Sequence, residues 1–136
     1  MITQKAINNL AYEIVGCAIE VHRNLGPGLL ESVYELCMID EISQKGLKVQ
    51  SQVYIPIQYK GRNLGGTLKL DILVNELIIV ELKAVDVMLP LFKAQLLSYL
   101  KLTGKPKGLL INFHCENIVE QMIPLVTSDF SKLPYS

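Results

Sequence analysis

The chain of 136 residues has the length of one domain, and its 13 basic and 13 acidic side chains leave no net charge, which argues against a protein that coats nucleic acid by bulk electrostatics. Half of the residues are hydrophobic, and this fraction excludes intrinsic disorder. No apolar run approaches the roughly 18 residues of a membrane span, and the first residues lack the layout of a signal peptide. Three cysteines without Cys-x-x-Cys spacing indicate thiols in a reducing compartment, so we expect a compact cytosolic protein.

Two amphipathic helices are predicted at the start of the chain. From Thr3 to Arg23, apolar residues recur at the spacing of one helical stripe. Thr3 can cap the first turn, and the run 26–28, which is Gly-Pro-Gly, ends the helix. A second apolar stripe begins near residue 30 and ends at Gly46.

The middle of the chain changes to the period of a β-strand. Polar and apolar residues alternate from 49 to 58, and Pro56 places this strand at a sheet edge or at a bulge because proline cannot donate to the ladder. Two aliphatic runs, 67–74 and 77–84, then predict a hairpin.

The last third of the chain predicts a helix and one or two strands. Pro90 suits the first turn of a helix that runs to about residue 102. Residues 108–113 form a short apolar strand, and 118–126 could add another. The order α-α-β-β-β-α-β indicates an α/β fold, a single-domain sandwich with a central mixed β-sheet flanked by helices. We expect the domain to span residues 1–126 and residues 127–136 to form a loose tail.

Charged residues within the aliphatic hairpin need an explanation. Lys69 and Asp71 share one face of the first strand, and Glu81 and Lys83 share one face of the second. Cross-strand ion pairs on a solvated face would explain them, and so would a magnesium or manganese site between the two carboxylates. For Asp71 and Glu81 to share a face, the connection must contain three residues or a bulge. Carboxylates clustered without a metal repel each other, so at least one should have a raised pKa.

The basic side chains are concentrated around this hairpin. Residues 48–107 carry nine basic and four acidic side chains, whereas residues 1–47 and 108–136 are both net negative. A local positive segment permits a phosphate-binding surface, although an unevenly charged solvated surface gives the same pattern.

Three short motifs lie on the predicted second helix, the hairpin and the third helix. In chain order they are Gly28-Leu29-Leu30-Glu31-Ser32-Val33-Tyr34, Asp71 followed after nine residues by Glu81-Leu82-Lys83, and Gln95-Leu96-Leu97-Ser98-Tyr99. They resemble the Gly-x-x-Glu-x-x-Tyr motif of the GxxExxY family, the Asp…Glu-x-Lys signature of the PD-(D/E)XK nuclease superfamily that contains it, and the Gln-x-x-x-Tyr motif of the superfamily's recombination-type branch. The resemblance covers about residues 14–126 and implies a restriction-endonuclease-like fold.

The resemblance implies a metal-dependent nuclease that hydrolyses phosphodiester bonds in nucleic acid, with DNA as the expected substrate and Mg²⁺ or Mn²⁺ as the cofactor. Asp71 and Glu81 would be metal ligands, helped by the backbone carbonyl of Leu82. Lys83 would position the attacking water or neutralise the phosphate in the transition state. Glu31 would be an outer acidic residue that binds a second metal or a metal-bound water.

Further roles follow from the same resemblance. Gln95 would orient the lysine or the water, and Tyr99 would contact a phosphate or a base. Tyr34 lies one turn from Glu31 and would fix the orientation of its side chain. Lys69 occupies the place of a substrate-binding basic residue, usually arginine, whereas Phe92 stands near the place where a histidine is expected.

Two other interpretations stay open at this point. The protein could be a catalytically degenerate member of the superfamily that binds nucleic acid or a protein partner, or the charged hairpin could form only structural ion pairs. A nuclease of this size often gains substrate affinity from dimerisation, so a homodimer is a further possibility.

Overall fold

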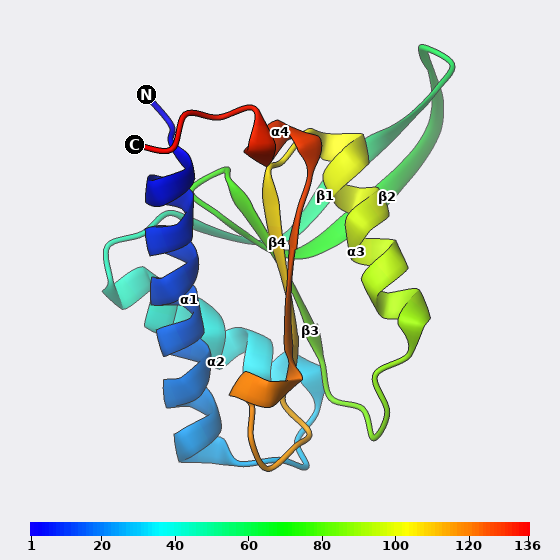
Figure 1. Cartoon of the computed structure of the whole chain (residues 1–136). Coiled ribbons are helices and arrows are strands. Elements are labelled where there is room, and N and C mark those ends of the chain that lie inside the picture. Colours follow the sequence, from blue (N-terminus) through cyan, green and yellow to red (C-terminus); the bar gives the residue numbers. More distant parts are fainter.

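The computed structural model describes residues 1–136 and is an α/β sandwich (Figure 1). The predicted order of elements is confirmed, with the second and third strands forming a hairpin before the third helix. The elements are α1 (Gln4–Leu25), α2 (Glu31–Gln44), β1 (Val49–Tyr59), β2 (Arg62–Val74), β3 (Ile78–Lys83), α3 (Pro90–Thr103), β4 (Lys107–Asn112), the 3₁₀ turn η1 (Val119–Gln121), β5 (Met122–Val126) and α4 (Ser128–Ser131). None of the helices is both long and hydrophobic enough to span a membrane.

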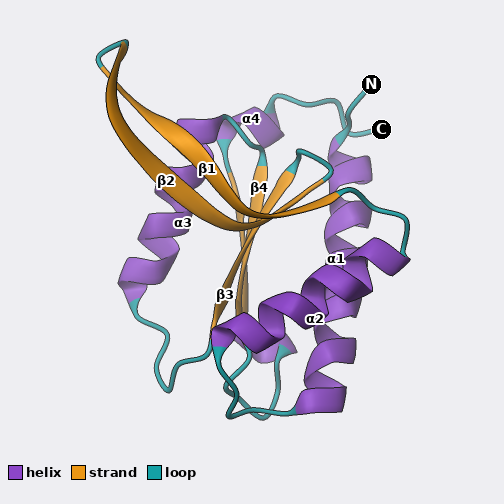
Figure 2. Ribbon diagram, turned by 180° about the vertical axis from the view of Figure 1, so that it is seen from behind, coloured by secondary structure: helices purple, strands orange, loops and turns teal.

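The five strands form one mixed sheet in the order β1-β2-β3-β4-β5. The β3–β4 pair is parallel and the other pairs are antiparallel. Helices α1 and α2 cover one face of this sheet and α3 covers the other, as Figure 2 shows. The predicted fold class is therefore confirmed.

Each face of the sheet has its own hydrophobic cluster. Val74, Ile78 and Val80 pack beneath α1 and α2, whereas Leu73 and Ile79 pack against α3. Neighbouring residues join opposite clusters because side chains alternate along a strand. This alternation explains why the central strands are apolar on both faces.

The helix ends follow from capping residues. The Thr3 hydroxyl accepts a hydrogen bond from the Ala6 N–H at 3.1 Å, and α1 ends at Gly26, whose φ is +69°. Helix α3 begins with Pro90 and ends at Gly104 in the left-handed conformation. Glycine adopts such positive φ values without steric cost, so both termini are encoded locally.

The register of the β2–β3 hairpin confirms the predicted connection. Three residues, 75–77, join the strands, and Ile72 pairs with Val80. Asn75 and Glu76 both have positive φ, which closes the turn. This register puts the positions of Asp71 and Glu81 opposite each other.

Strand β1 lies at the edge of the sheet, as Pro56 predicts, and its register against β2 also shifts between Pro56 and Gln58. Beyond the sheet, β1 and β2 continue together as a two-stranded ribbon that projects from the body of the protein (Figures 1 and 2).

The C-terminal residues differ from the expected loose tail. They contain the short helix α4, and Phe130 and Leu133 pack against the cluster beneath α1. The backbone N–H groups of Gln4 and Lys5 donate to the carbonyls of Pro134 and Tyr135, both at 2.9 Å. The segment is held because it provides acceptors for N–H groups in the first turn of α1, which have no partner within the helix. The predicted last strand is also shorter, because residues 119–121 form η1.

Candidate active site

The β2–β3 hairpin separates at the two carboxylates that the sequence singles out. Pairing between β2 and β3 ends at Ile72 and Val80. Farther from the turn, β2 pairs with β1 and β3 pairs with β4, but the two no longer pair with each other. The Leu82 N–H donates to Asp71 Oδ2 at 3.0 Å, and the Asp71 N–H approaches Glu81 Oε1 at 3.4 Å. Each carboxylate therefore satisfies a backbone donor of the opposite strand, in place of the ladder hydrogen bonds that the separation removes.

The Glu81 carboxyl group is buried, with 9% of the residue exposed. Burial, followed by the proximity of the Asp71 carboxylate and its negative charge, raises the pKa of Glu81 to about 9, while the Asp71 N–H and then the charge of Lys83 act in the opposite direction. The expected raised pKa is confirmed, although its largest cause is burial and not repulsion between the carboxylates. Because burial and the Asp71 carboxylate keep the Glu81 carboxyl group protonated, a cation bound between the two groups would be favourable.

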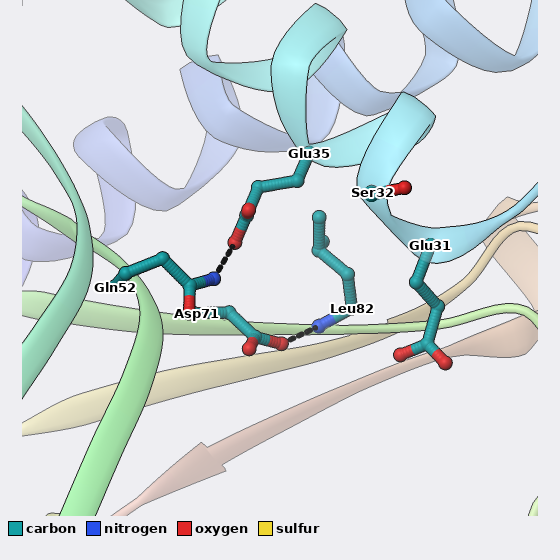
Figure 3. A pocket seen from close by; sticks show the side chains of 6 residues that line it. All are labelled: Glu31, Ser32, Glu35, Gln52, Asp71 and Leu82. Atoms are coloured by element: carbon teal, nitrogen blue, oxygen red, sulfur yellow. Dashed lines mark hydrogen bonds between the residues drawn. The ribbon is translucent and has the colours of Figure 1, made fainter.

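A pocket of about 140 Å³ opens beside this pair (Figure 3). It is lined by Glu31, Ser32 and Glu35 of α2, Gln52 of β1, Asp71 of β2 and Leu82 of β3. Figure 3 shows the Asp71 carboxylate beside the Leu82 backbone, with the Glu31 side chain extending toward the strands. The fold therefore brings Glu31 and Asp71 to one cavity, although they are far apart in the chain.

Three residues of this pocket were not predicted from the sequence: Ser32, Glu35 and Gln52. Gln52 Nε2 donates to Glu35 Oε1 at 2.6 Å. Burial raises the pKa of Glu35, while this hydrogen bond acts in the opposite direction. Glu35 lies four residues after Glu31, so helical spacing could have identified it. Gln52 has φ of +51°, a departure from strand geometry that its place in an alternating sequence does not reveal.

No group of three or more histidine, cysteine, aspartate or glutamate side chains is arranged to hold a metal ion, so the ligand set of Asp71, Glu81 and Glu31 stays a prediction. Glu31 is exposed at the first turn of α2 and lies at the pocket. The pair Asp71–Glu81 still fits a hard cation, since Mg²⁺ binds proteins through one or two carboxylates and completes its shell with water and substrate phosphates.

Lys83 lies on the α3 side of the site. Its Nζ is 4.4 Å from the centroid of the Phe92 ring, in cation–π geometry. Phe92, which stands near the expected histidine, therefore contacts the ammonium group that the Asp…Glu-x-Lys motif singles out.

Gln95 and Tyr99 lie together on α3. Burial first, and then the negative charges of Glu81 and Asp71, raise the pKa of Tyr99, while the Gln95 side chain acts in the opposite direction. Tyr99 therefore lies close enough to both carboxylates for their charges to affect its hydroxyl. Gln95 is exposed, and no hydrogen bond joins its side chain to Lys83.

Tyr34 is anchored beneath the loop that leads into α2. Its side chain is completely buried and stacks on Phe113 with ring centroids 4.5 Å apart. Its hydroxyl donates to the Gly26 carbonyl at 2.6 Å and accepts from the Leu29 N–H at 3.2 Å. Tyr34 therefore holds the loop that leads into α2, and it makes no hydrogen bond to Glu31. Within this loop Gly28 has φ of +98°, which favours glycine.

Lys69 stands at the edge of the same site. It is exposed, lies opposite Tyr54 in the β1–β2 ladder, and carries a charge that lowers the pKa of Glu35. The structure thus places a free cation beside a pocket lined by carboxylates.

Comparison with known proteins agrees with this geometry. A family model described as the PD-(D/E)XK nuclease superfamily matches residues 8–123. No curated protein and no solved structure matches the chain. The matched region contains the complete separated hairpin, the helix that carries Glu31 and the helix that carries Gln95. The chain therefore belongs to the PD-(D/E)XK nuclease superfamily.

Proposed function

We propose that this protein is a nuclease of the GxxExxY type that requires a divalent metal and hydrolyses phosphodiester bonds in DNA. Membership of the superfamily supports a nuclease-type function. The single observation that carries the finer proposal is the buried pair of carboxylates at the separation of β2 and β3, with Lys83 two residues after Glu81.

Asp71 and Glu81 would hold the metal, with the Leu82 carbonyl as a third oxygen ligand. The raised pKa of Glu81 supports this assignment, because a cation would replace the proton that the metal-free carboxyl group retains at neutral pH. Mg²⁺ or Mn²⁺ would polarise the phosphate and favour deprotonation of a water molecule when bound. Glu31, at the pocket, would bind a second metal or a metal-bound water.

The remaining residues would act on the substrate. Water would attack phosphorus in line with the leaving oxygen, the phosphorus–oxygen bond to that oxygen would break, and the proton lost by the water would balance the one that the leaving oxygen takes up from solvent. The Lys83 ammonium group stabilises the negative charge that develops on the phosphate. Tyr99 on α3 lies close to the carboxylates and would contact a phosphate or a base, Gln95 on the same helix would orient the lysine or the water, and Lys69 would bind a phosphate.

Plasmid cleavage tests the proposal. With Mg²⁺ or Mn²⁺ the wild-type protein should nick or degrade supercoiled DNA, and EDTA should abolish the reaction. Asp71→Asn and Glu81→Gln should each reduce the rate by about 100-fold or more, since each removes a charged ligand. Glu116→Gln is the matched control, because Glu116 is an exposed carboxylate without an ion-pair partner.

Lys83→Ala separates catalysis from binding. Metal binding, measured by calorimetry, should be unchanged while turnover falls, because the lysine acts in the transition state and not as a ligand. Lys132→Ala, which removes an exposed cation near the C-terminus, provides the control. A wild-type protein that binds DNA but cleaves neither DNA nor RNA with any divalent metal would instead be the catalytically degenerate binding module.

A further inference from the structure

The ribbon that β1 and β2 form beyond the sheet, hereafter the hairpin arm (residues 53–70), has little contact with the rest of the protein. Its β2 portion pairs only with β1, since β3 pairs with β2 no further than Ile72. Val53, Ile55 and Leu70 pack its base against the α3 cluster, and no side chain between residues 56 and 69 belongs to either hydrophobic cluster. Figures 1 and 2 show the arm extending into solvent. Core packing therefore does not explain its length.

The arm carries only positive charge. It contains Lys60, Arg62 and Lys69 and has no acidic residue. None of these three cations forms an ion pair, whereas Lys48 and Lys105 in the body of the protein both pair with Glu76. The arm therefore accounts for part of the positive segment seen in the sequence, and its charges are available to an anionic partner.

Two tyrosines stand beside these cations. Tyr54 is 64% exposed and lies directly opposite Lys69, and Tyr59 is 53% exposed and lies directly opposite Arg62. Directly opposed residues of an antiparallel pair project from the same face, so each ring has a cation as its neighbour. Lys60 Nζ is also 5.5 Å from the Tyr59 ring centroid. Exposed rings beside cations supply the two kinds of contact that proteins use on single-stranded nucleic acid, stacking on bases and pairing with phosphates.

The Tyr54–Lys69 pair connects the arm to the pocket. Gln52 and Asp71 both line the pocket. Gln52 lies two residues before Tyr54, and Asp71 lies two residues after Lys69. The charge of Lys69 also acts on Glu35 inside the pocket. A nucleotide bound at Tyr54 and Lys69 would therefore lie beside the pocket.

We propose that the hairpin arm binds unpaired nucleotides, with Tyr54 and Tyr59 stacking on bases and Lys60, Arg62 and Lys69 contacting phosphates. The inference rests on the proposed nuclease function and adds to it that the bound substrate is single-stranded. A continuous duplex offers no free base faces along its length, because its bases are stacked on one another, so the two exposed rings are suited to a single strand.

Fluorescence anisotropy in EDTA, which prevents hydrolysis, tests the arm. The probe is a fluorescein-labelled 20-nucleotide oligothymidylate, compared with its duplex with oligodeoxyadenylate. The wild-type protein should bind the single strand more tightly than the duplex. Tyr54→Ala and Tyr59→Ala should each weaken binding by about 5- to 100-fold, and Tyr54→Phe, which keeps the ring, should restore it. Lys60→Ala should reduce the slope of log K against log salt concentration by about 0.7.

Two variants provide matched controls outside the arm. Tyr12→Ala removes an 81%-exposed tyrosine from α1, and Lys132→Ala removes an exposed cation near the C-terminus, and neither should change the affinity. Circular dichroism should show unchanged folding for all variants, since the substituted side chains lie outside both hydrophobic clusters.

The outcomes separate the arm from the catalytic proposal. Alanine variants that bind like the wild type, a wild type that binds no oligonucleotide, or arm-dependent binding that favours the duplex would each overturn the inference. Arm-dependent binding of the single strand without hydrolysis under any metal would refute the nuclease function and leave the arm as a binding element. Plasmid cleavage with arm-independent binding would refute only the arm.

Discussion

The substitution Glu81→Gln should make the metal-free protein more stable at alkaline pH. The pKa of Glu81 is raised from 4.5 to about 9 by burial and by the nearby Asp71 carboxylate. The folded protein therefore keeps a proton that the unfolded chain releases. The stabilising effect of the Glu81 carboxyl group is complete below about pH 4.5 and is lost as the pH rises toward 9.

The size of the effect follows from this interval. Between pH 5 and pH 8, each pH unit lowers the free energy of unfolding by up to about 1.4 kcal/mol, which amounts to up to about 4 kcal/mol over the whole range. That is a large share of the roughly 5–15 kcal/mol that stabilises a typical domain. Glutamine keeps an oxygen that can accept from the Asp71 N–H and cannot ionise, so the variant should lack this part of the pH dependence.

Urea unfolding followed by circular dichroism in EDTA, at several values between pH 5 and pH 8, measures the difference. The two proteins should have similar stability at pH 5 and diverge as the pH rises, with the variant more stable. Glu116→Gln, which changes an exposed carboxylate, should follow the wild type. Parallel pH profiles of wild type and Glu81→Gln would refute the account of the site as a buried, mutually repelling pair.

Three further predictions concern the metal, the loop before α2 and the lysine. At pH 8, Mg²⁺ should raise the free energy of unfolding of the wild type, by about 2.7 kcal/mol at one hundred times the dissociation constant, and should stabilise Glu81→Gln less; equal stabilisation would contradict binding at this pair. Tyr34→Phe should cost about 1–2 kcal/mol in urea unfolding, because the Leu29 N–H and the Gly26 carbonyl lose their partner; an unchanged midpoint would contradict that role. Phe92→Leu should lower the cleavage rate about 2- to 5-fold without changing metal affinity, and Phe92→Tyr should restore it; a rate unaffected by Leu would show that the cation–π contact does not position Lys83.

Local sequence signals were sufficient for most of the framework. Thr3, Gly26, Pro90 and Gly104 mark helix ends through their own backbone and side-chain chemistry, so the helices were predictable without their neighbours. The β2–β3 register was also predictable, because only a three-residue connection or a bulge keeps Asp71 and Glu81 in phase. The tail was not predictable, since its order comes from contacts with the start of α1 at the other end of the chain.

Some residues of the site were predictable from local sequence, and others were not. Consecutive residues were enough to predict that Asp71, Glu81 and Lys83 lie on one hairpin, because the two-residue period of a strand is encoded locally. The separation of the strands at this pair, the presence of Glu35 and Gln52 in the pocket, and the burial of Tyr34 against a loop became visible only in the folded chain. These features depend on how a helix crosses the sheet and on which backbone groups lose their ladder partners. No periodicity within a single segment specifies such contacts between distant segments.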